Sequence, residues 1–284
     1  MAVRSDKSFL FLQELAEDLS RPEIAFPTFS DATLRVRAAL NNPLHSAAQL
    51  ATVVASEPLL AARLIKVANA AAFSRGGAQV ADVKSAVVRV GSTTVRSVAT
   101  AVAVDQMLQS ADLKPHRKKA EAIWQHSIDV AMLAYVIARG ISRVNPDEAL
   151  LAGLLQDIGH FYLLSRVKSY PDVANDPQEL DALLDEWHVG IGCSILVSMD
   201  LPAATVNAVE RHHAGSPPSP LVTPLRDLAE VLMVANGAAR HFSSQQGAAS
   251  VRDNPDLPPV DPVVLQLLVT SVDELKALAA ELRG

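Results

Sequence analysis

The segment Glu57–Phe73, with the sequence EPLLAARLIKVANAAAF, carries the pattern that decides the fold. Its apolar side chains recur at spacings of three and four residues, so a helix would place them on one face; they are Leu60, Leu64, Val67, Ala68 and Ala71. Directly upstream, the run Ser46-Ala47-Ala48-Gln49 has the spacing of a capping box. It predicts the start of a short helix through Leu50, Val53 and Val54, so two consecutive helices are expected here.

Helical spacing continues downstream of this pair. Three further segments place apolar residues on one helical face; these residues are Val130, Leu133 and Ile137, then Leu151, Leu154, Leu155 and Ile158, then Leu184, Trp187, Ile191 and Ile195. No alternating pattern typical of a β-strand persists along the chain. The sequence therefore predicts an all-α fold.

The composition of the 284-residue chain narrows its functional classes. Hydrophobic residues make up 49% of the sequence, too many for a disordered chain, and the length is sufficient to bury a large core. The formal net charge is -6, so the protein as a whole attracts neither nucleic acid nor an anionic membrane surface. Aromatic residues amount to 4%, which leaves few rings for stacking against nucleobases. We therefore expect neither a nucleic-acid partner nor a membrane.

The sequence also predicts a cytoplasmic protein. Cys193 is the single cysteine, so the chain has no internal disulfide, which fits a reducing compartment. Its thiol is expected to pack as a small hydrophobic group. The apolar run Phe9–Leu12 is too short for a signal peptide, and no uncharged apolar stretch reaches the roughly 18–20 residues of a membrane span.

Six of the eight histidines follow residue 120, and the chemistry is expected there. His126 and His188 share the apolar faces of their predicted helices, while Asp157 follows an apolar run. His212 and His213 end another predicted helix. Imidazoles and a carboxylate that converge from several helices can bind a divalent ion such as Zn, Fe, Mn or Ni. The predicted ligands are therefore His126, Asp157, His188, His212 and His213.

Each of these positions also has a purely structural interpretation. A histidine on an apolar face can be a hydrogen-bonded core residue. The helix dipole and the free carbonyls favour histidines in the last turn of a helix. Spacing alone leaves both interpretations open.

Several motifs together resemble a known family. The segment 57–73 followed by Val83–Gly91, VKSAVVRVG, is similar to the signature of HDOD domains, the HD-related output domains of bacterial signalling. A series of later residues resembles the HD phosphohydrolases, in particular their HD-GYP branch: His126, Gln156-Asp157-Ile158-Gly159, His188, Gly192, Leu201-Pro202 and His212-His213. The resemblance covers about residues 20–240. It implies an HD-domain-like helical bundle with an additional N-terminal helical subdomain.

The implied organisation has three parts. Residues 1–19 form an N-terminal extension, 20–115 the N-terminal helical part of the HDOD domain, and 116–284 the HD-like helical bundle. The boundary falls in a basic polar stretch that precedes most of the histidines. About 20 residues precede the matching part, whereas a receiver domain needs roughly 100. We therefore expect the signal to arrive by a route other than a receiver domain.

The sequence departs from active HD enzymes where their metal ligands are expected. Gln156 stands in place of the histidine of the His-Asp pair, and Asn236 in place of a late-helix aspartate. His160 replaces a lysine, and no Gly-Tyr-Pro motif follows His213. One imidazole and one carboxylate are thus missing from a site that would have to activate water. The expectation is a degenerate site that holds one divalent ion (Mn, Fe, Ni or Zn) or no cofactor.

These features predict a non-catalytic HDOD-type regulatory protein in bacterial signal transduction. It would act through a protein partner or through a small ligand such as a nucleotide, and no catalytic residue is predicted. The competing hypothesis is a metal-dependent phosphohydrolase, similar to HD-GYP enzymes, that acts on a nucleotide or a cyclic dinucleotide. The oligomeric state stays open.

A third hypothesis is DNA binding. The segments Ala47–Ala55 and Leu59–Ala72, joined by a short turn, have the dimensions of a helix-turn-helix motif. The second segment offers only Arg63, Lys66 and Asn69 for contacts with bases and phosphates. Two antiparallel core helices explain the same pattern.

Overall fold

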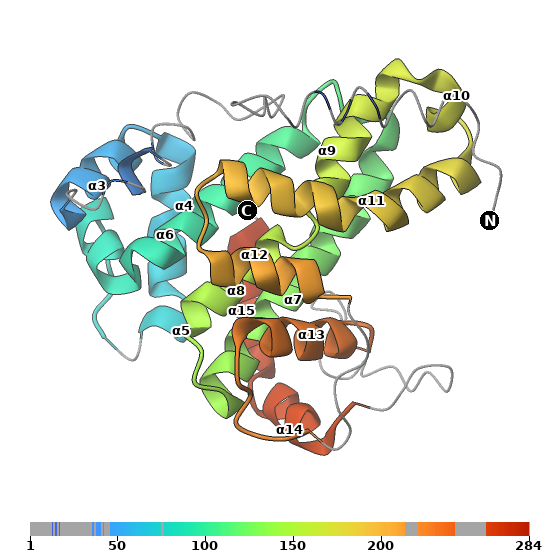
Figure 1. Ribbon diagram of the computed structural model, residues 1–284. Helices are drawn as coiled ribbons and strands as arrows, with labels where there is room; N and C mark the ends of the chain where they lie inside the picture. The colour runs from blue at the N-terminus through green and yellow to red at the C-terminus, as the bar shows by residue number, and fades with distance from the viewer. Residues whose placement is uncertain are drawn as a thin grey trace.

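The computed structural model of this chain is built from α-helices (Figure 1). It describes residues 13, 15, 17, 36, 38–40, 42, 46–74, 77–213, 221–241 and 260–283. The elements are α3 (Ala47–Ala55), α4 (Pro58–Asn69), α5 (Ala71–Ser74), α6 (Val83–Leu108), η1 (Lys114–His116), α7 (Arg117–Ile141), α8 (Pro146–Leu155), α9 (Ile158–Arg166), η2 (Val167–Ser169), α10 (Pro171–Ala174), α11 (Pro177–Ser198), α12 (Ala203–Arg211), α13 (Leu228–Ala239), α14 (Pro262–Thr270) and α15 (Val272–Arg283). Over these residues there is no β-strand, and one isolated bridge pairs Ser142 with Leu225. The all-α fold expected from the sequence is confirmed.

The first two helices form largely as predicted. The Ser46 hydroxyl accepts a hydrogen bond from the backbone N–H of Gln49 at 3.3 Å, and the Gln49 side chain accepts one from the Ser46 N–H at 2.8 Å. This reciprocal pair is the predicted capping box of α3. The helix α4 begins at Pro58 and buries its apolar face. It ends at Asn69, so Ala71, which was predicted to continue its apolar face, belongs to the next helix, α5.

The long helix α6 is kinked and largely buried. Gly91, in its middle, has φ 78° and ψ 169°, a conformation that residues with a side chain rarely adopt. By length and composition alone, α6 could cross a membrane, but 61% of its most apolar window is buried within the protein. Burial and the kink identify it as a helix of the hydrophobic core.

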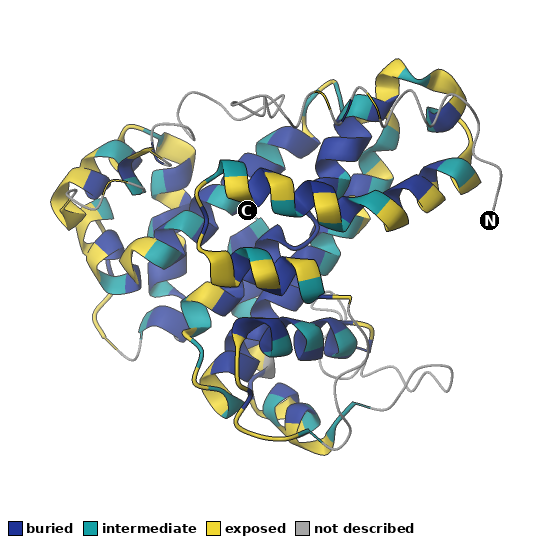
Figure 2. Ribbon diagram, viewed as in Figure 1, coloured by how far each residue is buried: buried dark blue, intermediate teal, exposed yellow. Residues whose placement is uncertain are grey.

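The helices α7 and α8 form the centre of the fold. In Figure 1 they pass behind α11 and α12. The helix α7 packs on α8, α13 and α15, while α8 packs on α6 as well. Figure 2 shows that the residues of α7, α8 and α9 are mostly buried. Polar groups carried by these helices therefore lie inside the bundle unless they are near an end.

One hydrophobic core extends through both of the predicted parts. The helix α6 packs on α8, and the C-terminal helix α15 packs on α4 and α5. Within this junction Arg63 donates to the carboxylate of Asp105 at 2.5 Å and to the carbonyl of Leu282 at 3.5 Å. The boundary expected at residue 115 stays a prediction.

Candidate metal centre

The site is centred on Asp157, at the junction of α8 and α9. The helix α8 ends at Leu155, and Asp157 directly precedes α9 without a side-chain hydrogen bond to that helix. Its carboxylate lies inside the bundle, with the side chain 5% exposed. Its Oδ2 accepts hydrogen bonds from Ser127 Oγ at 3.2 Å and from Gln156 Nε2 at 3.1 Å. Its Oδ1 faces a group of histidines.

Two buried histidines, His188 and His212, turn their Nε2 atoms toward the centre of the site. The Nδ1 of His188 lies 2.8 Å from the Leu184 carbonyl, and the Nδ1 of His212 lies 2.5 Å from the Val209 carbonyl. A neutral imidazole that donates from Nδ1 keeps a lone pair on Nε2. His212 Nε2 lies 3.9 Å from Asp157 Oδ1. Neither Nε2 atom has a hydrogen-bond partner among the residues that the structure describes. The backbone carbonyls thus favour the tautomer that binds a metal through Nε2.

His213 completes a group of four potential ligands. One ligand atom from each of Asp157, His188, His212 and His213 lies within 4.8 Å of the others. Two atoms that both bind Zn²⁺ at about 2.0–2.1 Å can be at most about 4.2 Å apart. The group therefore needs only a small contraction to surround an ion. Three imidazoles and one carboxylate suit zinc and the neighbouring transition metals, so these residues could hold a divalent ion.

His160 also belongs to this cluster. Its ring stacks on His188 with centroids 3.9 Å apart, and its Nδ1 lies 3.3 Å from Asp157 Oδ1 without hydrogen-bond geometry. His160 was not among the five predicted ligands, since in the HD resemblance it stands only in place of a lysine. The spacing could have indicated this position, because Asp157 and His160 are three residues apart at the start of a helix and so lie on the same side.

Burial favours the neutral form of these imidazoles. It lowers the pKa of His188, with His160 adding to the effect, and it lowers the pKa of His212 although Asp157 opposes the shift. His213 is the exposed member of the group, and partial desolvation together with the two neighbouring histidines lowers its pKa to about 4. For Asp157, burial raises the pKa, but the contact with His160 and the other nearby imidazoles hold it well below its usual range. At neutral pH the site thus offers one carboxylate and unprotonated imidazoles, the state in which these groups bind metals.

His126 lies in a polar network that reaches Oδ2 of Asp157. Its Nε2 lies 3.2 Å from Asn236 Oδ1. The amide of Asn236 donates to Gln156 Oε1 at 2.6 Å, and Gln156 in turn donates to Asp157. Each of these three contacts pairs a donor with an acceptor when His126 carries its proton on Nε2. We define the three side chains His126, Asn236 and Gln156 as the amide network.

A model of the HDOD domain matches residues 26–215 of the chain. The chain belongs to the HDOD family. The matched range contains all the gathered histidines and Asp157, whereas Asn236 follows it on α13. The amide network therefore joins the HDOD domain to a helix beyond the matched residues.

Three solved structures resemble this HDOD protein over its whole length. A protein from Shewanella amazonensis SB2B, provisionally named a metal-dependent phosphohydrolase, is 25% identical with a TM-score of 0.72; the match covers 98% of this chain and 100% of that one. An HDOD domain protein of unknown function from Geobacter sulfurreducens is 19% identical, with a TM-score of 0.58 and 98% of each chain covered. A protein from Marinobacter aquaeolei VT8, provisionally named for signal transduction, is 19% identical with a TM-score of 0.54; the match covers 100% of this chain and 68% of that one. These structures confirm the HD-like fold, and no curated protein matches the sequence.

In this HDOD domain a glycine lets α9 approach α11 closely. A Cβ atom on Gly159 would lie 2.0 Å from the carbonyl oxygen of His188 and 2.9 Å from the backbone N of Gly192. Only a residue without a side chain allows this approach. Because Asp157 lies two residues before Gly159, the contact also sets the distance between the carboxylate and the histidine of α11.

The structure gathers four of the five predicted ligands, namely Asp157, His188, His212 and His213. It places His126 in the amide network instead, with Nε2 directed at Asn236. Binding of an ion by these residues stays a prediction.

Proposed function

We propose that this HDOD protein is a non-catalytic regulator that binds one divalent transition-metal ion through Asp157, His188, His212 and His213. The observation that carries the proposal is the amide network beside the four ligands. Its members Gln156 and Asn236 stand at the positions where the HD resemblance implies further ligands.

The ligand groups present suffice for one ion but offer few ligands to a second one. When bound, a divalent ion supplies Lewis acidity and lowers the pKa of a bound water. A second ion would need further anionic or imidazole ligands. In the amide network, Gln156 and Asn236 are neutral amides bonded to each other, and His126 faces Asn236 through Nε2. Carboxamides are weak ligands compared with imidazole and carboxylate.

The regulator would act in bacterial signalling, in the cytoplasm, through a protein partner or a small ligand. Membership of the HDOD family supports this role. The structure gives little support to DNA binding, because Arg63 is buried against Asp105 and the Asn69 amide bonds both backbone groups of Val80. Of the three polar residues considered for DNA contacts, Lys66 alone is exposed.

A metal-dependent phosphohydrolase is the second candidate function. The Shewanella amazonensis protein that is 25% identical carries that provisional name. Within the described part of the chain, buried ring nitrogens of His160, His188 and His212 lack hydrogen-bond partners, which favours an ion or polar ligand among them. The two candidate functions share the metal site, but only the phosphohydrolase would hydrolyse a phosphate ester.

One experiment measures metal binding and turnover on the same protein. Metal-free protein is titrated with Zn²⁺, Ni²⁺ and Mn²⁺ by calorimetry, and each loaded form is assayed with a cyclic dinucleotide and a chromogenic phosphodiester. We expect one ion per chain, tighter binding of Zn²⁺ and Ni²⁺ than of Mn²⁺ because imidazoles dominate the site, and no hydrolysis.

Variants locate the site and separate the two candidates. Asp157→Asn and His188→Gln should each weaken Zn²⁺ binding at least about tenfold, whereas His116→Gln, outside the cluster, should leave it unchanged. Metal-dependent turnover that Asp157→Asn abolishes would establish the phosphohydrolase. Failure to bind any of the three ions would refute the metal site.

A further inference from the structure

A surface groove lies between α11 and α12, on the part of the fold that faces the viewer in Figure 1. Its volume is about 520 Å³, within the range of about 300–1,000 Å³ that is usual for ligand pockets. It is lined by Val197, Asp200, Leu201, Ala203, Val206, Asn207 and Glu210. We define these residues as the α11–α12 groove.

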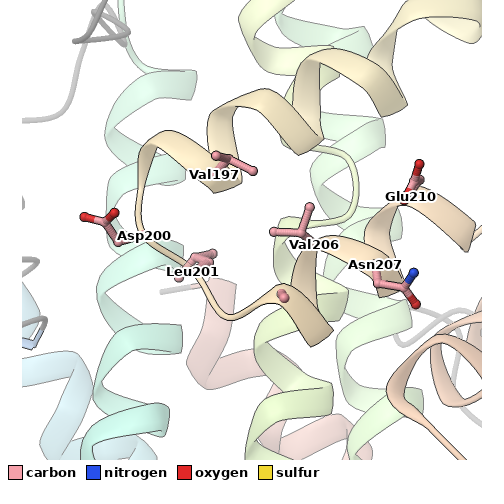
Figure 3. A pocket seen from close by; sticks show the side chains of 7 residues that line it. Val197, Asp200, Leu201, Val206, Asn207 and Glu210 are labelled. Atoms are coloured by element: carbon pink, nitrogen blue, oxygen red, sulfur yellow. The ribbon is translucent and has the colours of Figure 1, made fainter.

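The middle of the groove is apolar. In Figure 3 the side chains of Val197, Leu201 and Val206 lie between the two ends of the groove. Val197 is 63% exposed, which is high for a large hydrophobic residue in this protein. A partner that covered Val197 would gain the free energy of burying its apolar surface.

The two ends of the groove are acidic. Figure 3 shows Asp200 at one end and Glu210 at the other. Both residues are exposed, and no hydrogen bond or ion pair to the described part of the chain engages either carboxylate. Among the residues that the structure describes, no lysine or arginine lines the groove. Its local charge is therefore negative.

The backbone at Asp200, in the turn between α11 and α12, has an unusual conformation. Asp200 has φ 54°, the only positive φ among the described residues other than glycine. This left-handed conformation favours glycine, although aspartate tolerates it. The turn between α11 and α12 thus has an aspartate at the end of the groove, although its backbone conformation is the one that favours glycine.

We infer that the α11–α12 groove binds a segment of a partner protein that presents an aliphatic or aromatic side chain flanked by Lys or Arg. The apolar side chain would lie against Val197, Leu201 and Val206, and the flanking cations would face Asp200 and Glu210. Charge complementarity decides the class of partner. Phosphate-bearing partners such as nucleic acid or anionic lipid would be repelled, and so would a second copy of a chain with net charge -6.

The inference does not depend on the metal site. The groove residues include none of the four proposed ligands. Failure of metal binding would therefore leave the docking proposal standing, and failure of docking would leave the metal proposal standing.

The test measures binding of a synthetic peptide to the full chain by fluorescence anisotropy. The probe is a labelled amphipathic peptide with a central Trp between two pairs of Arg, and its counterpart carries Glu in place of every Arg. We expect the basic peptide to bind at least about tenfold more tightly than the acidic one, with an affinity that falls as salt rises. Equal affinity of the two peptides, or no binding of either, would overturn the inference.

Matched variants test the acidic ends and the apolar middle separately. Asp200→Asn with Glu210→Gln should weaken binding of the basic peptide about three- to tenfold. Asp185→Asn with Glu121→Gln changes the charge equally at exposed positions outside the groove and should have no effect beyond a small uniform one. Val197→Asp should abolish docking of the Trp side chain, whereas Val88→Asp, at a valine that is 66% exposed on α6, should not.

The oligomeric state tests whether a second copy of the chain occupies the groove. Sedimentation should show the same mass for the unaltered chain and for Val197→Asp. A dimer that Val197→Asp dissociates would assign the groove to a second copy of the chain and overturn the proposed partner. Equal loss of peptide binding in the two double variants would show attraction by net charge alone, which also contradicts docking in the groove.

Discussion

At the residue scale, Asn236 stands at a position that bears on how many ions the proposed site could hold. Its two amide atoms face His126 and Gln156, so a neutral side chain separates two potential ligands. We expect the double variant Gln156→His with Asn236→Asp to bind a second equivalent of Zn²⁺, because it adds an imidazole and a carboxylate beside Asp157. Calorimetry gives the stoichiometry, and circular dichroism shows whether the variant folds. A folded double variant that still binds a single ion would contradict this prediction.

Gly159 sets the distance between the helices that carry the proposed ligands. We expect Gly159→Ala to lower the free energy of unfolding by about 3 kcal/mol, because its Cβ would overlap the His188 carbonyl oxygen and α9 would have to move. Zn²⁺ affinity should fall as well. Gly190→Ala, on α11, is the matched control: nothing lies within 4 Å of its Cβ, and loss of a helical glycine should stabilise the protein by about 0.5–1 kcal/mol. Urea denaturation measures both, and equal unfolding free energies for the two variants would refute the role of Gly159.

At the element scale, one partly buried ion pair joins the helices α4 and α6. Arg63 on α4 contacts Asp105 on α6, which also accepts from Trp124 Nε1 on α7 at 3.0 Å. Burial raises the pKa of Asp105, although Arg63 opposes the shift. We expect Arg63→Ala to cost about 3 kcal/mol of unfolding free energy because it leaves a partly buried carboxylate unpaired. Lys119→Ala, which breaks an exposed pair with Asp181, should cost less than about 1 kcal/mol. Thermal or urea denaturation measures both variants. Similar losses of unfolding free energy would contradict the expected difference between the partly buried and the exposed ion pair.

The sequence predicted those elements whose signals are local. The capping box at Ser46 placed the start of α3 correctly because both partners lie three residues apart. The end of α12 was predicted two residues late: the helix ends at Arg211, so His212 and His213 follow it. Spacing could not predict the amide network, because Asn236 meets Gln156 across 80 positions of sequence. Only the family resemblance had placed both residues at one site. Such a contact depends on how α13 packs, and no spacing rule encodes that.

At the scale of the whole molecule, α11 and α12 connect the proposed metal site with the proposed docking groove. The helix α11 carries His188 and, further along, Val197. The helix α12 carries Val206 and is followed by His212. The two helices pack directly on each other. A change in their separation at one site would therefore alter the other.

This arrangement predicts positive coupling between metal and partner peptide, and the prediction rests on both proposals. An ion held by His188 and His212 would fix the separation of α11 and α12, so the groove would lose less freedom when the peptide binds. We expect saturating Zn²⁺ to tighten binding of the basic peptide about fivefold relative to EDTA, and the peptide to tighten Zn²⁺ binding by the same factor.

Two variants separate this coupling from other effects of zinc. In Asp157→Asn, added Zn²⁺ should leave the peptide affinity unchanged, which excludes a direct contact between zinc and the probe. In Val197→Asp, the Zn²⁺ affinity should match that of the unaltered chain while peptide binding is lost, because Val197 is exposed and outside the ligand group. If both variants behave in this way but zinc leaves the peptide affinity of the unaltered chain unchanged, then α11 and α12 hold the same separation with and without the ion, and the two sites act independently.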